Sequence, residues 1–182
     1  MKIIPTSIPD VLLIEPRVFK DPRGYFFESF NEAAFHKAVP GVQFIQDNEA
    51  FSQRGTLRGL HFQAPPYAQA KLVRVVQGRV LDVAVDMRKR SPTFGQHVDM
   101  ELSGENKRQL YVPRGFAHGY VVLSETAVFA YKVDHVYHKA SEQGVIFNDP
   151  ALAIHWPIDA DQLLLSDKDK VLPQFKDAVY FD

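Results

Sequence analysis

The stretch "KLVRVVQGRVLDVAVD" (71–86), with "TLRGLHFQ" (56–63) shortly before it, decides the fold. Valine-rich segments on both sides of "QG" are typical of two β-strands joined by a turn. The longer stretch begins with Lys71 and carries Asp82 in its interior, and the earlier one places an arginine and His61 among a glycine and apolar residues. We interpret these ionisable groups as facing the inside of a small barrel, where a proton is transferred.

The composition is that of one globular domain. Of the 182 residues, 46% are hydrophobic and 12% aromatic, which suffices for a hydrophobic core. The 14 Phe and 7 Tyr favour strands over helices. We expect a single domain over residues 1–182, with an N-terminal arm at about 1–45, a barrel at about 46–148 and a C-terminal segment at about 149–182.

Charge and cysteine content exclude several classes of function. With 21 basic and 22 acidic residues the net charge is −1, so no overall field attracts nucleic acid or a membrane surface. The absence of cysteine excludes disulfides, thiolate metal sites and cysteine nucleophiles, and it fits a reducing cytoplasm. Pro5 and Pro9 interrupt the first residues, which argues against a signal peptide, and no apolar run is long enough to span a bilayer. We predict a cytoplasmic protein with neither a nucleic-acid nor a membrane partner.

Alternating apolar residues and turn signals predict an all-β protein with a few short helices. One helix is expected over 31–40, capped by Asn31, and the charged run Arg88–Arg90 is interpreted as a solvated turn. Short strands separated by turns are typical of a sandwich or closed barrel. The strands are expected over 11–19, 24–30, 44–52, 71–88 (two strands broken at "QG"), 97–103, 108–113, 118–124 and 126–137.

Two patches resemble the paired motifs of the cupin barrel. In the first, Gly55 and His61 precede Lys71 and Gly78, and the second is "PRGFAH" (113–118). This resemblance implies a cupin double-stranded β-helix, an eight-stranded jelly roll whose interior holds the site.

A metal centre is the weaker interpretation of these motifs. Metal-binding cupins supply two histidines and a glutamate from the first motif and one histidine from the second. Here Gln63 stands at the second histidine's place and Lys71 lies near the glutamate's place, which leaves His61 and His118. A cationic lysine repels a divalent ion, and two histidines are too few for a closed site unless carboxylates help. We therefore predict neither a metal nor another cofactor.

The same residue types suit the formation of an enolate. An ammonium such as that of Lys71 stabilises the oxyanion that forms when a proton leaves the carbon next to a carbonyl. His61 is the candidate base, since imidazole titrates near neutrality, and a tyrosine hydroxyl on the other face is a suitable acid. Asp82, an acid inside a strand, needs a polar partner. The residues alone leave the partners of His61 open.

Eight segments together resemble the dTDP-4-dehydrorhamnose 3,5-epimerase family in order and spacing, over nearly the whole chain. The resemblance implies epimerisation of dTDP-4-dehydro-6-deoxy-D-glucose at C3 and C5 to dTDP-4-dehydro-L-rhamnose, in dTDP-L-rhamnose biosynthesis. Each segment is weak by itself, and the set is specific. The segments are "DPRGYFFESF", "QDN", "TLRGLHFQ", "QAKLVRVVQGRVLDVAVDMR", "VPRGFAHGY", "YKVDHVY", "FNDP" and "LSDKDKVLP".

The resemblance also implies the catalytic residues. These are the base His61, its partner Asp169, the acid Tyr131, and Lys71 facing the 4-keto oxygen. From the residues alone, Asp167 competes with Asp169, and the second tyrosine of its segment, Tyr137, competes with Tyr131. Only the family pattern selects between them.

The substrate-binding residues follow from the same resemblance. The nucleotide end is assigned to Arg23 and Glu28 of the early segment together with 46–48, because guanidinium groups match phosphate oxygens and a carboxylate accepts from a thymine imide. In this family the arm with the early arginine crosses into a partner subunit, so a homodimer with exchanged arms is implied. The full set is Arg23, Glu28, Gln46, Asp47, Asn48, Arg58, Asp82, His118, Glu142 and Lys168.

Three alternatives remain open at this point. A relative with the same fold inverts only C3 or C5, or acts on another nucleotide-linked keto sugar. A non-catalytic cupin that binds a sugar nucleotide needs the arginines Arg23 and Arg58 but has no use for a His–Asp pair opposite a tyrosine. A metal-dependent cupin is disfavoured by Gln63 and Lys71.

Overall fold

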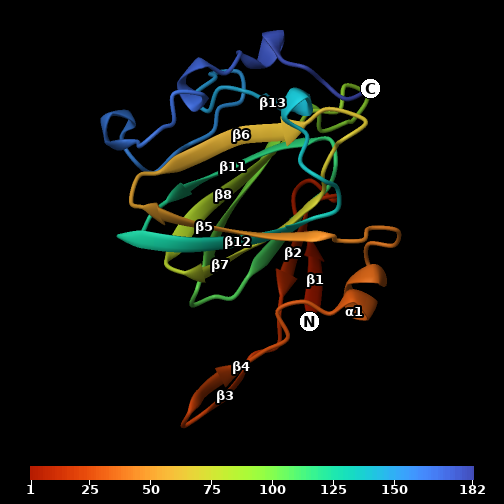
Figure 1. The fold of residues 1–182 in the computed structure, drawn as a ribbon, viewed down its shortest axis with the longest axis vertical. Coiled ribbons are helices and arrows are strands. Elements are labelled where there is room, and N and C mark those ends of the chain that lie inside the picture. The colour runs from red at the N-terminus through yellow and green to blue at the C-terminus, as the bar shows by residue number, and fades with distance from the viewer.

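The computed structural model describes residues 1–182, and thirteen short strands dominate it (Figure 1). Helix is confined to α1 (Glu32–His36) and the 3-10 turns η1 (Lys139–Ser141), η2 (Ala160–Gln162), η3 (Asp169–Val171) and η4 (Phe175–Asp177). The strands are β1 (Lys2–Pro5), β2 (Leu12–Glu15), β3 (Phe19–Asp21), β4 (Gly24–Phe26), β5 (Gln46–Gln53), β6 (Leu57–Gln63), β7 (Lys71–Gln77), β8 (Arg79–Asp86), β9 (His97–Ser103), β10 (Gln109–Val112), β11 (Phe116–Val122), β12 (Thr126–Val133) and β13 (Glu142–Gly144).

The strands form two main antiparallel sheets that face each other. One has the order β1-β2-β10-β7-β12-β5 and the other β13-β6-β11-β8-β9, while β3 and β4 pair only with one another. In Figure 1 the sheet with β6 and β11 lies over the sheet with β12 and β7, and the β3–β4 hairpin projects away from both. This is the all-β jelly roll of the cupin class, so the predicted fold class is confirmed.

The inner faces of the two sheets enclose the main core. Its 15 buried residues include Val73 of β7, Val80 of β8 and Phe129 of β12. The outer face of the second sheet is covered as well, because Val83 and Val85 pack under the C-terminal segment with its Trp156. Burial on both faces explains why β8 and β11 have near-continuous apolar runs instead of strict alternation.

Most predicted strands are confirmed, with shorter bounds at the N-terminal end. The strand expected over 11–19 breaks after Glu15, where Pro16 has no N–H to donate, and β4 ends at Phe26. The expected helix is wrong beyond Lys37. Asn31 caps it through its side chain as predicted, but the next two amides both bond to the Phe35 carbonyl and the chain turns away before Pro40. β1, β6 and β13 were not predicted, nor was β3 beyond its first residue, Phe19.

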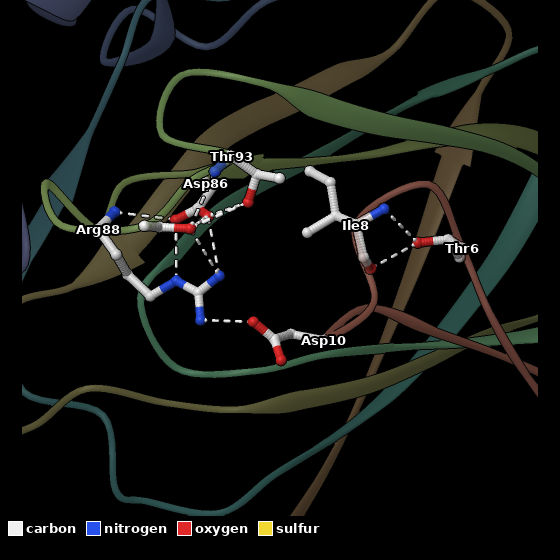
Figure 2. Close-up of polar contacts among 7 residues, drawn as sticks. Thr6, Ile8, Asp10, Asp86, Arg88 and Thr93 are labelled. Carbon is white, nitrogen blue, oxygen red and sulfur yellow. Dashed lines mark hydrogen bonds and ion pairs between the residues drawn. The ribbon is translucent and has the colours of Figure 1, made fainter.

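The solvated turn expected at Arg88–Arg90 is also wrong at its first residue. Figure 2 shows the Arg88 guanidinium between two carboxylates, at 2.8 Å from Asp86 and 2.7 Å from Asp10. Asp86 is fully buried and also accepts from the hydroxyls of Ser91 and Thr93. We call these five residues the Asp86 cluster. It ties the N-terminal segment to the end of β8.

Candidate active site

A cavity of about 320 Å³ opens between the two sheets, in the size range of small-molecule sites. Strands β6 and β11 supply one wall, strands β5, β7 and β12 supply the other, and the loop around η3 closes the rim. The lining residues are Ala50, Arg58, His61, Lys71, His118, Tyr120, Phe129, Tyr131, Glu142, Ser166, Lys168 and Asp169.

An irregularity in β6 turns two of its polar side chains into this cavity. Arg58 and His61 are three residues apart, and such residues point to opposite faces of a regular strand. The pairing with β11 shifts by one residue between His61–His118 and Arg58–Tyr120, which is a β-bulge. Consequently both side chains line the cavity, while Leu57 and Leu60, the residues directly before them, pack on the outer face.

Glycine is required at this bulge. Gly59 has φ +137, a conformation that other residues rarely adopt, and a Cβ there would lie 2.6 Å from the Cα of Gly119 on β11. The two strands therefore approach closely only because glycine faces glycine. The backbone of the site therefore explains why a glycine follows the arginine in "RGLH".

His61 forms a hydrogen-bonded pair with Asp169. Its Nε2 lies 2.5 Å from Asp169 Oδ1, and the Asp169 side chain is 4% exposed. Burial alone would raise the pKa of Asp169, but hydrogen bonds from His61 and Ser166 outweigh it and hold the pKa below the usual value. An ionised carboxylate only accepts, so Nε2–H donates to it and Nδ1 is the nitrogen left as the proton acceptor. The competitor Asp167 is fully exposed and pairs with Lys170.

Lys71 is a cation without a fixed partner in the same cavity. Burial lowers its pKa to about 8, although the charges of Asp82 and Glu142 act in the opposite direction. No ion pair of the chain includes Lys71. The ammonium is therefore available to an oxyanion, and it is the charged form below about pH 8.

His118 and Asp82 form a second pair deeper between the sheets. Nε2 of His118 lies 3.0 Å from each oxygen of the fully buried Asp82 carboxylate. Burial lowers the pKa of His118 and outweighs the opposing effect of the Asp82 carboxylate, and the nearby charge of Lys71 lowers it further. The imidazole is thus neutral at neutral pH. Asp82 holds its Nε2 in place but does not itself line the cavity.

Tyr131 reaches the cavity from the wall opposite His61. It is partly buried on β12, and burial raises the pKa of its phenol, so it carries its proton at neutral pH. Tyr137, the alternative tyrosine, is 56% exposed and donates its hydroxyl to Glu142. Glu142 also accepts from Lys168 at 2.5 Å, and this ion pair stands at the rim.

The predicted nucleotide-binding residues lie outside this cavity. Asp47 and Asn48 line a neighbouring cavity that shares Tyr131, and Gln46 donates to the Asn48 side chain. Arg23 is on the β3–β4 hairpin, paired with Asp21 at 2.6 Å and 90% exposed, and Glu28 accepts from Asn31 nearby. Within one chain, the structure does not bring Arg23 or Glu28 to the other predicted residues.

Several cavity-lining residues were missed by the sequence analysis. Ala50, Tyr120, Phe129 and Ser166 all contribute to the lining. Tyr120 had a usable signal, because it lies two residues after His118 and residues i and i+2 of a strand share a face. Ser166, which bonds Asp169, had no such signal because it lies in an irregular loop.

The residues of the chain form no arrangement of three or more His, Cys, Asp or Glu side chains that could hold a metal ion. Gln63, at the place of a metal-binding histidine, is buried and fully engaged with backbone. Its amide nitrogen donates to the carbonyls of Tyr67 and Val136, and its oxygen accepts from the His138 amide. The longest helix, α1, has five residues, so none of the helices could span a bilayer.

Comparison with known proteins gives a consistent result. The family model described as dTDP-4-dehydrorhamnose 3,5-epimerase matches residues 5–177. The dTDP-4-dehydrorhamnose 3,5-epimerase of Shigella flexneri is 55% identical over 182 residues, which cover 100% of this chain and 99% of that protein.

Two solved structures are similar over almost the whole chain. That of dTDP-4-dehydrorhamnose 3,5-epimerase from Elizabethkingia anophelis has a TM-score of 0.92 and 55% identity, covering 97% of each chain. That of dTDP-6-deoxy-D-glucose-3,5-epimerase from Legionella pneumophila, in complex with dTDP-4-keto-L-rhamnose, has a TM-score of 0.93 and 48% identity. The latter match covers 96% of this chain and 93% of the other.

Proposed function

The chain belongs to the dTDP-4-dehydrorhamnose 3,5-epimerase family, and from that premise we propose how its cavity carries out the reaction. The substrate is dTDP-4-dehydro-6-deoxy-D-glucose, and inversion at C3 and C5 gives dTDP-4-dehydro-L-rhamnose for dTDP-L-rhamnose synthesis. His61 is the base, Tyr131 the acid, and Lys71 the group that stabilises the enolate. No cofactor takes part in these steps.

One observation supports this proposal above the others: the His61–Asp169 pair and Tyr131 enter one cavity from opposite sheets. Inversion of a carbon centre requires a proton to leave one face and another to arrive on the opposite face. A base on β6 and an acid on β12 flank a sugar ring in that way. A protein that only binds the sugar nucleotide has no need of such a pair.

Each inversion follows the same sequence of proton movements. His61 Nδ1 takes the proton from the carbon next to C4, and the electron pair of that C–H bond moves to O4 as an enolate. The Lys71 ammonium donates to this oxygen, in the manner of an oxyanion hole. Tyr131 then gives its hydroxyl proton to the carbon from the opposite face. Asp169 stabilises the imidazolium until His61 releases its proton to solvent and Tyr131 takes a proton from solvent.

The nucleotide is proposed to extend from the rim toward the second cavity. Arg58 and Lys168 supply cations for the diphosphate, and Asp47 and Asn48 line the space beyond. His118 contacts the sugar with Asp82 behind it, and Glu142 positions Lys168 at the rim. The location of this reaction in the cytoplasm stays a prediction, which cell fractionation tests.

Arg23 and Glu28 are proposed to act in the cavity of a partner subunit. The β3–β4 hairpin projects from the barrel (Figure 1) and exposes Phe19 by 49%, Tyr25 by 57% and Phe26 by 67%. A lone two-stranded hairpin with such exposed rings is at best marginally stable in water, so a covering partner is expected. A homodimer with exchanged arms would complete both sites.

Incubation with dTDP-4-dehydro-6-deoxy-D-glucose in heavy water tests the reaction. Because the exchanged protons come from solvent, NMR of the product should show deuterium at both C3 and C5. Deuterium at only one of these carbons would indicate an epimerase for a single centre. Tight dTDP binding without any exchange would contradict catalysis and favour a binding protein.

Subunit mixing tests the exchanged arm. Arg23→Ala and His61→Asn each inactivate a homodimer, but in a mixed dimer the intact arm reaches the intact His61. Refolding the two variants together should therefore restore about a quarter of wild-type activity, since half of the dimers are mixed and half of their sites are complete. No recovery in a mixture shown to contain mixed dimers would rule out exchange.

A further inference from the structure

The hydroxyl of Tyr120 is the one buried side-chain polar atom of the chain without a hydrogen-bond partner. The residue is 5% exposed on β11 and lines the catalytic cavity. Arg58 and Ser52 lie close enough to the phenol to oppose the effect of burial on its pKa, but no hydrogen bond joins either of them to it, and Ser52 accepts instead from both Nε and Nη2 of Arg58. A buried donor without an acceptor destabilises a protein, so a functional reason is expected.

The ring that carries this hydroxyl is held in a fixed orientation. Tyr120 stacks on Phe129 of the opposite sheet, with ring centroids 4.0 Å apart and planes 13° apart. Phe129 is itself 2% exposed, so the pair cannot swing into solvent. Burial raises the pKa of Tyr120, which keeps the hydroxyl protonated and able to donate.

The position of Tyr120 points to the sugar and not to the nucleotide. It pairs with Asp82 on β8 and with Arg58 on β6, but Tyr120 is 5% exposed whereas Arg58 is exposed, so the phenol lies deeper in the cavity, beside the second His–Asp pair. The exposed cations Arg58 and Lys168 lie at the rim, where the diphosphate is expected. A ligand that enters sugar first brings its hexose oxygens to this deep layer.

We propose that Tyr120 donates a hydrogen bond to an oxygen of the hexose and is a binding residue of the site. The inference rests on the proposed function for the identity of the ligand, a hexose linked to dTDP. The free protein keeps the donor unpaired, and the sugar supplies the acceptor. The sugar nucleotide should therefore bind more tightly than dTDP alone.

Tyr120→Phe tests this directly, because it removes only the oxygen. Calorimetric titration with dTDP-glucose, which lacks the 4-keto group and does not react, should show about tenfold weaker binding, and titration with dTDP alone should change by less than about twofold. The kcat/KM for the keto sugar should fall about 10- to 100-fold. The Tm should stay the same or rise, since a buried unpaired donor has been removed.

Tyr111→Phe is the matched control. Tyr111 is also 5% exposed but lies on β10 against Phe35, outside the catalytic cavity, so its loss should leave both affinities unchanged. Equal binding of dTDP-glucose to wild type and Tyr120→Phe would overturn the proposal. So would an equal loss of dTDP affinity, which would assign the contact to the diphosphate, or a fall in Tm with both affinities intact, which would assign the hydroxyl to folding. A wild type that binds dTDP-glucose but exchanges no ring protons of dTDP-4-dehydro-6-deoxy-D-glucose would refute the proposed reaction and leave the binding test of Tyr120 valid.

Discussion

Asp82 and Asp86 lie four residues apart on the same face of β8, and both are fully buried, yet their surroundings differ. Asp86 accepts five hydrogen bonds from the backbone and guanidinium of Arg88 and the hydroxyls of Ser91 and Thr93 (Figure 2). Asp82 has a single donor, Nε2 of His118. One carboxylate is saturated and the other is not.

The difference separates a structural cluster from a reactive one. Around Asp86 every strong donor has an acceptor within the chain, so the cluster has no capacity left for a ligand. Around Asp82 the cavity keeps the Lys71 ammonium without an ion pair, the Tyr120 hydroxyl without an acceptor and one nitrogen of His61 unengaged. Buried polar groups that remain unsatisfied are typical of sites that a ligand completes.

His61→Asn should give the largest effect and test the reactive side of this comparison. Loss of the general base should lower kcat for proton exchange by about 10³- to 10⁴-fold, while the Tm changes little. His155→Asn is the matched control, because His155 is exposed and lies outside the cavity. Exchange in heavy water within tenfold of wild type would remove His61 from its role.

Lys71→Met should lower kcat/KM by about 10²- to 10³-fold, since an oxyanion donor is lost. Because the wild-type pKa is about 8, wild-type kcat/KM should decline as pH rises through this value, and the variant should lack that decline. The unfolded chain binds more protons between about pH 8 and the free-lysine value of 10.5, so wild-type stability relative to the variant should rise with pH in this window. A wild-type kcat/KM that stays constant up to pH 10 would contradict this role for Lys71.

Asp86→Asn tests the Asp86 cluster, whose carboxylate is saturated with hydrogen bonds. It should lower stability without changing the catalysed reaction. Removing one partner of a buried ion pair should reduce the free energy of unfolding at neutral pH by about 3 kcal/mol, measured with urea. Hydrogen bonds from Arg88, Ser91 and Thr93 outweigh burial and lower the pKa of Asp86 to about 2, so its contribution is present above the unfolded value of 3.8 and lost as pH falls through about 2.

Asp10→Asn is the control for this prediction. Asp10 binds the same guanidinium from a side chain that is 58% exposed, and its loss should reduce stability by less than about 1 kcal/mol. The folded Asp86→Asn enzyme should keep its kcat within about twofold. A large loss of kcat in the folded variant would show that the two clusters are coupled and break the comparison.

The sequence predicted the fold class and much of the candidate site for identifiable reasons. Valine-rich runs separated by glycine and proline predict short antiparallel strands, and the two strands at 71–88 were confirmed. An aspartate inside such a run must have a buried partner, and His118 is that partner. Strand bounds near the N-terminus failed because Pro16 interrupts the apolar run that predicted one strand, and because the chain beyond it forms a separate hairpin, β3–β4, that pairs with neither main sheet.

Only the tertiary structure decided which of several chemically equal residues meet. Asp169 and Asp167 have the same chemistry, and the loop around η3 turns only Asp169 toward His61. The sequence predicted a solvated Arg88. In the structure, the end of β8 and the N-terminal segment enclose its guanidinium.

The sequence by itself determined that polar groups lie inside a β-barrel, because alternation and apolar content follow from local side-chain identity. Alternation alone would place Arg58 and His61 on opposite faces of β6. They share a face only because the strand contains one additional residue between them. That insertion is possible only where Gly59 meets Gly119, and these residues are brought together by pairing across the sheet. Side-chain direction in a strand is set by register, and register is a property of the neighbouring strand as much as of the strand itself.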